Sequence, residues 1–210
     1  RREAVNRHPV PVAFFDIVGY NMSVMHATDE TAYQQFAWVG RDLYQAQMVS
    51  SHGGNLSIRR GDRLIIKRSG AMLGHLQPAD LIETGVLEDD ENTPRCSTEL
   101  IVHRAIYQAT PAQAVVHAHP RTTVALSLSR ETIVPLDSEG GVLLGPVQVV
   151  AVERPSGSPE VAQAVAEALE RAPIVVVRSH GSFATGDTLE QAFQRTSILE
   201  ESCQIIWKAE

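Results

Sequence analysis

The spacing of apolar residues along the chain changes between helical and strand periodicity, and this predicts a mixed α/β domain. Apolar or small residues recur every three or four positions in the helical segments, whereas short runs rich in Val and Ile are typical of buried strands. Helices are expected over residues 29–49, 97–108, 122–129, 160–171 and 188–207. Strands are expected over residues 55–59, 64–67, 114–119, 147–152 and 174–178.

The connections between these segments indicate how the strands pair. Arg60-Gly61-Asp62 predicts a tight turn, so the strands on either side of it should form a hairpin. Residues 76–81 suggest a short helical or turn segment, and Glu139-Gly140-Gly141 suggests another turn. Because hairpins mix with helical crossovers, we expect a three-layer α/β sandwich, with a mixed, mainly antiparallel central sheet and helices on both faces.

The chain has 210 residues, which favours one domain. Residues 1–28 predict an N-terminal leader, either a strand or an interface arm, because prolines interrupt its apolar run. Residues 29–210 are expected to form the folded domain.

Charge and composition limit the kinds of molecule that the protein is expected to bind. The formal net charge is −7 and Lys and Arg do not cluster, which argues against a nucleic-acid surface. The apolar runs are too short to span a bilayer, and Arg1-Arg2-Glu3 does not resemble the start of a signal peptide. Cys96 and Cys203 suggest neither a disulfide framework nor a cysteine zinc site. We therefore expect a cytoplasmic protein whose partners are small molecules and copies of itself.

Three histidines carry the sharpest chemical signal. His117 and His119 are two positions apart at the end of a strand, so both side chains emerge on one face of the sheet. His180 follows another strand and precedes Gly181, which leaves the backbone free to turn. Three imidazoles with one open position are a common catalytic zinc arrangement. The alternative for so short a motif is a set of unrelated core or surface histidines.

Five short motifs occur in one order along the chain. They are Gly54-Asn55-Leu56-Ser57-Ile58-Arg59, Ser69-Gly70, Ser97-Thr98-Glu99, His117-Ala118-His119-Pro120 and Ser179-His180-Gly181. Together they resemble the class II aldolase/adducin family, in particular its L-fuculose-1-phosphate aldolase and L-ribulose-5-phosphate 4-epimerase group. The resemblance extends from near residue 30 to Trp207.

The resemblance implies that His117, His119 and His180 are metal ligands, with zinc favoured and manganese, iron or cobalt also compatible with imidazole. It implies that Glu99 is the carboxylate that moves a proton beside the substrate carbonyl. The epimerases usually have aspartate at this place, so Glu99 favours aldol chemistry. Without the neighbouring motifs, Glu99 would be interpreted as an ordinary residue of the first helical turn.

The resemblance also implies a phosphate site. The expected phosphate contacts are Asn55, Ser69, Gly70, Ser97 and Thr98. Small residues, hydroxyls and a helix start near Ser97 are suited to binding an anion on physical grounds alone. His52 departs from the small hydroxyl residue common in the sugar-phosphate aldolases, which leaves the size and charge of the anion open. His103 follows Glu99 by one helical turn, where it either supports the site or packs in the core.

These observations predict a zinc-dependent lyase that cleaves a phosphorylated ketose reversibly into dihydroxyacetone phosphate and an aldehyde. The family uses late tyrosines at the aldehyde end, but no tyrosine follows Tyr107, so that proton donor is unassigned. Decarboxylase, epimerase and dehydratase activities on the same scaffold remain alternatives, as does a non-catalytic, adducin-like interaction protein. The resemblance further implies a homotetramer.

Overall fold

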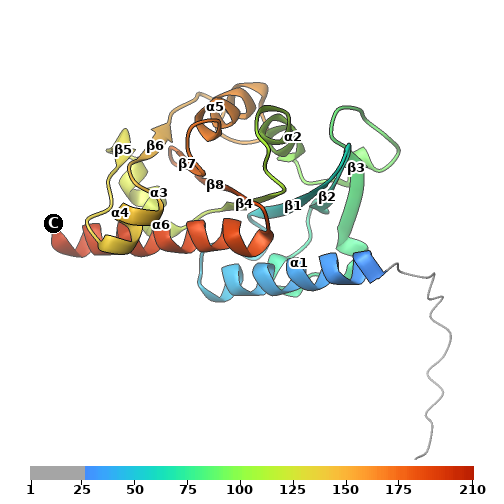
Figure 1. Ribbon diagram of the computed structural model, residues 1–210, viewed down its shortest axis with the longest axis horizontal. Helices are drawn as coiled ribbons and strands as arrows, with labels where there is room; N and C mark the ends of the chain where they lie inside the picture. The colour runs from blue at the N-terminus through green and yellow to red at the C-terminus, as the bar shows by residue number, and fades with distance from the viewer. Residues whose placement is uncertain (1–26) are drawn as a thin grey trace, which may run out of the picture.

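The structure, a computed structural model, describes residues 27–210 (Figure 1). Residues 1–26 of the expected leader lie outside the described residues. Within the described range, eight strands form one sheet in the order β3-β2-β1-β4-β8-β7-β6-β5. The strands are β1 (Asn55–Arg60), β2 (Arg63–Lys67), β3 (Leu81–Gly85), β4 (Ala114–Ala118), β5 (Thr132–Ile133), β6 (Val147–Val150), β7 (Ile174–Val177) and β8 (Gly181–Gly186).

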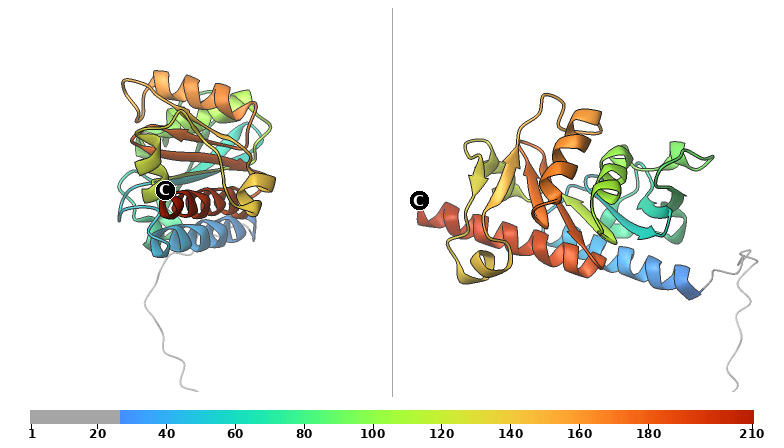
Figure 2. Two further views of the ribbon diagram at one scale, coloured as in Figure 1. Left: turned by 90° about the vertical axis from the view of Figure 1, so that its left-hand side faces the viewer. Right: turned by 45° about the horizontal axis from the view of Figure 1, so that its top comes forward.

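Helices cover both faces of the sheet, which confirms the predicted three-layer sandwich. On one face α2 packs against α5, and on the other α6 contacts α1, α3 and α4 (Figure 2). The helices are α1 (Ala27–Gln45), α2 (Leu100–Ala109), α3 (Arg121–Ser127), α4 (Ser138–Leu143), α5 (Pro159–Leu169) and α6 (Leu189–Ala209). Among residues 27–210, no helix has both the length and the apolar character needed to cross a membrane.

The sheet is antiparallel at every junction of neighbouring strands except between β6 and β7, which are parallel. Alternate residues of each strand enter different cores, because successive side chains point to opposite faces. Val115 of β4 packs in the core with α2 and α5, whereas Val116 packs in the core with α1 and α6. This alternation places His117 on the same face as Val115.

Several element bounds differ from the sequence prediction. The helix expected from residue 97 begins at Leu100, so Ser97, Thr98 and Glu99 precede it. The first helix ends at Gln45 rather than near residue 49, and the strand expected to reach residue 152 ends at Val150.

One short helix and three strands were not predicted from the sequence. The turn expected at Glu139-Gly140-Gly141 belongs to α4, which begins where the Asp137 side chain accepts a hydrogen bond from the Gly140 N–H. Strands β3, β5 and β8 were missed. The last of these is composed largely of small residues with weak strand preference, but all six are buried between β4 and β7.

Candidate active site

Three histidines from two parts of the sheet converge at one end of its central strands. His117 is the fourth residue of β4, His119 follows that strand, and His180 lies in the turn between β7 and β8. One ring nitrogen from each lies within 4.8 Å of the others. Nε2 of His119 is 3.0 Å from Nε2 of His117. The structure therefore brings together the three predicted ligands.

Two backbone features allow this convergence. A Cβ atom on Gly181 would lie 2.1 Å from the carbonyl oxygen of Ala118, so only glycine lets β8 approach β4 this closely. The left-handed turn residue is Ser179, with φ of 61°, rather than Gly181 as its sequence position had suggested. The backbone N–H of Ser179 donates to the Ser127 hydroxyl at 3.1 Å, which helps hold this turn.

Two of the three histidine rings, those of His117 and His119, are held in the neutral form that binds metals. Nδ1 of His117 donates to the Ser182 carbonyl at 3.0 Å, which leaves the Nε2 lone pair free. Burial, reinforced by His119 and His180, holds the pKa of His117 well below its usual range. Burial, His180 and Lys67 lower the pKa of His119 to about 4. Both rings are thus unprotonated near neutral pH.

Two further observations fit the histidine set to a divalent metal. Nδ1 of His180 is buried and has no hydrogen-bond partner among the described residues. Burying an unpaired ring nitrogen costs free energy unless another group, such as a metal ion, binds its lone pair. Phe183 stacks on His117 with ring centroids 4.0 Å apart, which holds the imidazole plane in place. Three imidazoles at this separation form a donor set suited to zinc or another transition metal.

Glu99 lies immediately before α2 and is buried, with 4% of its surface exposed. Its Oε1 accepts a hydrogen bond from the Ser156 hydroxyl at 2.5 Å. Its Oε2 is buried without a hydrogen-bond partner in the described part of the chain. Ser156 lies in the loop between β6 and α5, and none of the sequence motifs includes it. A carboxylate with one tethered and one free oxygen can exchange a proton with a ligand.

One cavity of about 160 Å³ unites the predicted site. All nine residues predicted as ligands, proton carrier or phosphate contacts line it, namely Asn55, Ser69, Gly70, Ser97, Thr98, Glu99, His117, His119 and His180. His52, Gly53, Gly54, Lys67 and Ser156 complete its lining. Residues from all five sequence motifs therefore face a single space.

The anion end of the cavity differs in detail from the prediction. The backbone N–H groups of Ser69 and Ser97 already donate to the carbonyls of Arg95 and Lys67, at 2.9 and 3.0 Å. These two serines therefore offer their hydroxyl groups to a ligand rather than their amides. The helix that was to begin at Ser97 starts three residues later, which moves its positive end towards Glu99.

Lys67 is a cation in this cavity that the sequence analysis missed. Its side chain is buried and Nζ donates to the carbonyls of His52 and Ala71, at 3.1 and 2.8 Å. Burial, together with nearby Arg68, lowers its pKa to about 8. The available signal was its position at the end of a predicted strand, two residues before Ser69.

The remaining singled-out residues are also placed. The His52 ring is exposed and pairs with the Ser51 hydroxyl at 2.9 Å, although the residue lines the cavity. Cys96 is buried outside the cavity lining, and burial raises the pKa of its thiol to about 11. The thiol is therefore an unreactive packing group. His103 is fully buried behind Asn55.

Comparison with known proteins decides the family. Residues 34–207 match the model of the class II aldolase and adducin N-terminal domain. The chain belongs to this family. An L-fuculose phosphate aldolase of Methanocaldococcus jannaschii is 27% identical over 173 residues, covering 82% of this chain and 93% of the relative. A 3-oxo-tetronate 4-phosphate decarboxylase of Haemophilus influenzae is 28% identical, covering 86% and 89%.

Solved structures of the class II aldolase family share the fold. The L-fuculose-1-phosphate aldolase of Thermus thermophilus superimposes with a TM-score of 0.81 at 38% identity, covering 84% of this chain and 93% of that one. The relatives of this chain therefore include a sugar-phosphate aldolase and a decarboxylase of a phosphorylated acid. Membership of the family alone does not distinguish between their reactions.

Proposed function

We propose that this protein is a metal-dependent aldolase that reversibly cleaves a phosphorylated ketose, similar to fuculose 1-phosphate, into dihydroxyacetone phosphate and an aldehyde. The observation that carries the proposal is the shared cavity, in which Glu99 with one unpartnered oxygen lies with the histidine cluster and a cationic, hydroxyl-rich end. The fuculose phosphate aldolases among the relatives support the same assignment.

His117, His119 and His180 would hold the metal, with zinc favoured and manganese, iron or cobalt compatible with the same ligands. A divalent ion there supplies Lewis-acid chemistry, polarising the ketone and stabilising negative charge on its oxygen. Neutral imidazoles suit this task because they leave most of the ion's positive charge available to the substrate.

The chain's other residues bind the substrate and move its proton. Asn55, Ser69, Gly70, Ser97 and Thr98 would hold the phosphate, with the Lys67 ammonium supplying positive charge. Cleavage begins when the C4 hydroxyl loses its proton to solvent. C4 then becomes the aldehyde carbonyl, the bond between C3 and C4 breaks, and its electron pair stays on C3, next to the ketone carbonyl. Glu99, which has taken up a proton from solvent on Oε2, delivers that proton to C3, while the Ser156 hydroxyl keeps Oε1 in place. In the reverse direction, Glu99 removes that proton.

Decarboxylation of a phosphorylated keto acid is the second candidate, and a relative with that activity favours it. Loss of carbon dioxide would leave the same kind of carbanion for Glu99 to protonate, and Lys67 would suit an acidic substrate. Epimerase and dehydratase reactions use related chemistry. A non-catalytic, adducin-like role is disfavoured, because the histidines and Glu99 all face one cavity.

Hydrogen exchange in dihydroxyacetone phosphate tests the proposal. Proton NMR in deuterated water, with metal-loaded protein, should show that one hydrogen on the hydroxyl-bearing carbon is replaced without any aldehyde present. The exposed-site variant Glu167→Gln should exchange at the parental rate, since this residue lies on the surface of α5. Absence of exchange at millimolar substrate, with release of carbon dioxide from a phosphorylated keto acid, would establish the decarboxylase instead.

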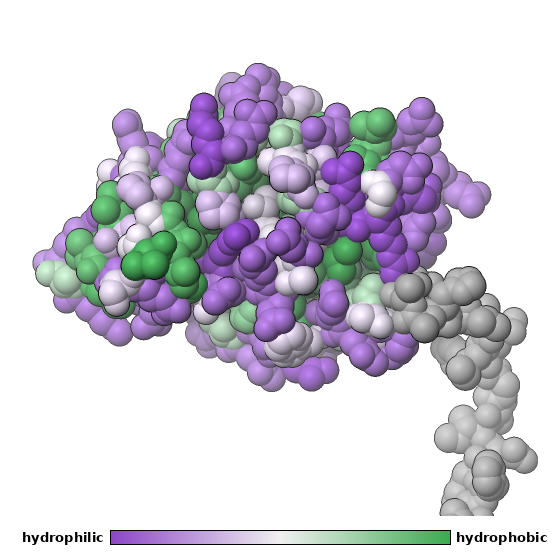
Figure 3. Space-filling view, viewed as in Figure 1, coloured by the Kyte–Doolittle hydropathy of each residue, from purple (hydrophilic) through white to green (hydrophobic). Residues whose placement is uncertain are grey.

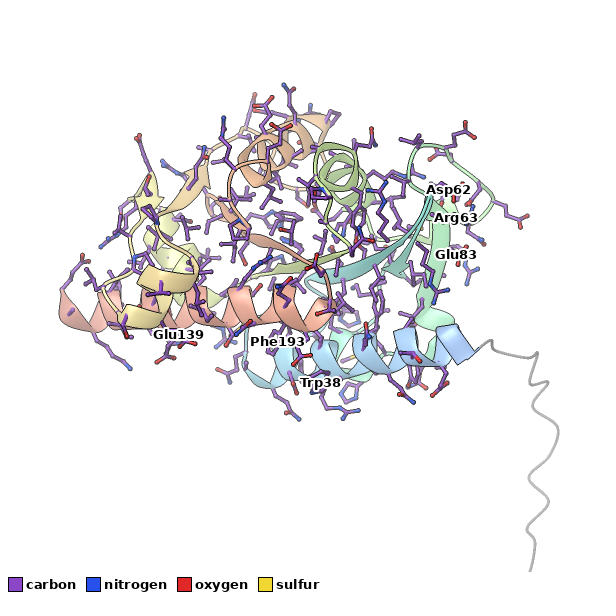
Figure 4. All side chains as sticks on the ribbon, in the orientation of Figure 1. Trp38, Asp62, Arg63, Glu83, Glu139 and Phe193 are labelled. Atoms are coloured by element: carbon purple, nitrogen blue, oxygen red, sulfur yellow. The ribbon has the colours of Figure 1, made fainter. Side chains whose placement is uncertain are left out.

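We also propose a cytoplasmic homo-oligomer, a tetramer by family resemblance. Apolar side chains are exposed around α4 and the end of α6, where apolar surface is visible in Figure 3; examples are Leu136, Val142 and Trp207. A groove of about 630 Å³ beside Trp38 of α1 and Phe193 of α6 adds a further candidate contact (Figure 4). Light scattering that shows only active monomer at micromolar concentration would contradict the oligomer.

A further inference from the structure

A chain of four buried polar side chains extends from the cavity into the core, and the proposed chemistry leaves three of them without a role. Nε2 of His103 lies 2.5 Å from Oδ1 of Asn55, and Nδ1 of the same ring lies 2.6 Å from the Ser57 hydroxyl. That hydroxyl lies 2.7 Å from the hydroxyl of Tyr107. All four residues are at most 4% exposed. Of the four, only Asn55 lines the cavity.

The direction of these hydrogen bonds is decided at their buried end. The Tyr107 hydroxyl has one hydrogen, and within residues 27–210 its only hydrogen-bond partner is Ser57. Tyr107 must therefore donate to Ser57, because the opposite direction would bury that hydrogen without an acceptor. Ser57 in turn donates to Nδ1 of His103. Burial lowers the pKa of His103 to about 3, so its ring is neutral and carries its single proton on Nε2.

The proton on Nε2 fixes the Asn55 amide. A donor at that position requires an acceptor, so Asn55 must present Oδ1 to His103. The amide nitrogen Nδ2 is then the group that Asn55 offers to the cavity. Asn55 is itself held in β1, where it pairs with His117 of β4. The amide therefore cannot rotate without breaking hydrogen bonds as far away as Tyr107.

We propose that Tyr107, Ser57 and His103 are positioning residues that lock Asn55 as a hydrogen-bond donor and so make this end of the cavity selective for an anion, such as a phosphate monoester. The identity of that anion as the substrate phosphate rests on the proposed function. The locked orientation does not, because it follows from the buried hydrogen bonds alone.

The first test reads the proton position directly. Nitrogen NMR of the full chain labelled with ¹⁵N-histidine distinguishes a protonated ring nitrogen from an unprotonated one. The His103 signals are assigned by their loss in His103→Gln. We expect the proton on Nε2 of His103 and none on Nδ1. A proton on Nδ1 would overturn the proposal, whether or not the protein has aldolase activity.

The second test measures anion binding in two variants of one position. His103→Leu removes the donor to Asn55, whereas His103→Gln keeps an N–H near the same place. His103→Leu should weaken binding of inorganic phosphate, and raise KM in the dihydroxyacetone phosphate exchange, on the order of 10-fold with little change in kcat. His103→Gln should recover most of the loss.

Equal phosphate affinity in the parent and in folded His103→Leu would overturn the positioning role. If His103→Leu does not fold, the tautomer of His103 in the parent protein still tests the positioning role. The two hypotheses also fail separately. Absence of exchange in the parent refutes the aldolase while the tautomer and phosphate titration still stand, and normal exchange with a reversed tautomer refutes only the positioning chain.

Discussion

Substitution of Gly181 tests whether the close approach of β8 to β4 is what assembles the histidine cluster. Gly181 follows His180 directly and begins β8. A Cβ atom added there would lie 2.1 Å from the carbonyl oxygen of Ala118 and 2.8 Å from Cδ2 of His119. The first of these atoms is backbone, so a rotamer change cannot relieve the contact. Gly181→Ala must therefore push the two central strands apart beside the cluster.

The size of the effect follows from the contact. Relief requires a shift of more than an ångström, and overpacking of a tight interior typically costs about 1–3 kcal/mol. In a chain of this length, each 1 kcal/mol lowers Tm by about 2–4 °C, so Gly181→Ala should lower Tm by roughly 2–12 °C. The same displacement moves His119 relative to His117, so the variant should also retain less metal than the parent.

Thermal unfolding followed by circular dichroism, together with elemental analysis of gently purified protein, measures both effects. Gly141→Ala is the matched control, because Gly141 lies within α4 and a Cβ atom there meets nothing within 4 Å. That control should be neutral or slightly stabilising, since alanine favours the helix. If Gly181→Ala matched the parent in both Tm and metal content, the argument that this glycine permits the cluster would be refuted.

Four further substitutions probe the site. Glu99→Gln should keep the fold and metal but lose on the order of 100-fold to 10,000-fold of the exchange rate, because an amide cannot carry the proton; a parental rate would make Glu99 structural. His117→Ala and His180→Ala should each lower metal content by elemental analysis, and unchanged content would remove the ligand assignment. Lys67, with its pKa of about 8, is protonated below that pH. KM for phosphorylated substrate should therefore rise as pH increases through 8 in the parent, whereas Lys67→Met should have a high KM that does not show this change.

Much of the fold could be predicted from local pattern. The hairpin at Gly61, the strand that carries His117 and the long last helix follow from periodicity and turn residues, because these signals are contained in short windows of sequence. The strand Gly181–Gly186 could not be predicted in this way. Its two glycines, serine and alanine have little strand preference of their own, and neighbours on both sides impose the conformation.

The sequence by itself determined which residue types could do the chemistry. His117 and His119 share a face because strand side chains alternate, and the ordered motifs predict Glu99 as a proton carrier and the residues expected to contact an anion. Tertiary structure decided which of these groups meet and in what state. The pairing of β4 with β8 places His180 beside His117, and burial keeps the His117 ring neutral. Only the tertiary structure shows the roles of Lys67, Ser156 and the buried partners of Asn55, because contacts between residues distant in sequence have no local signal.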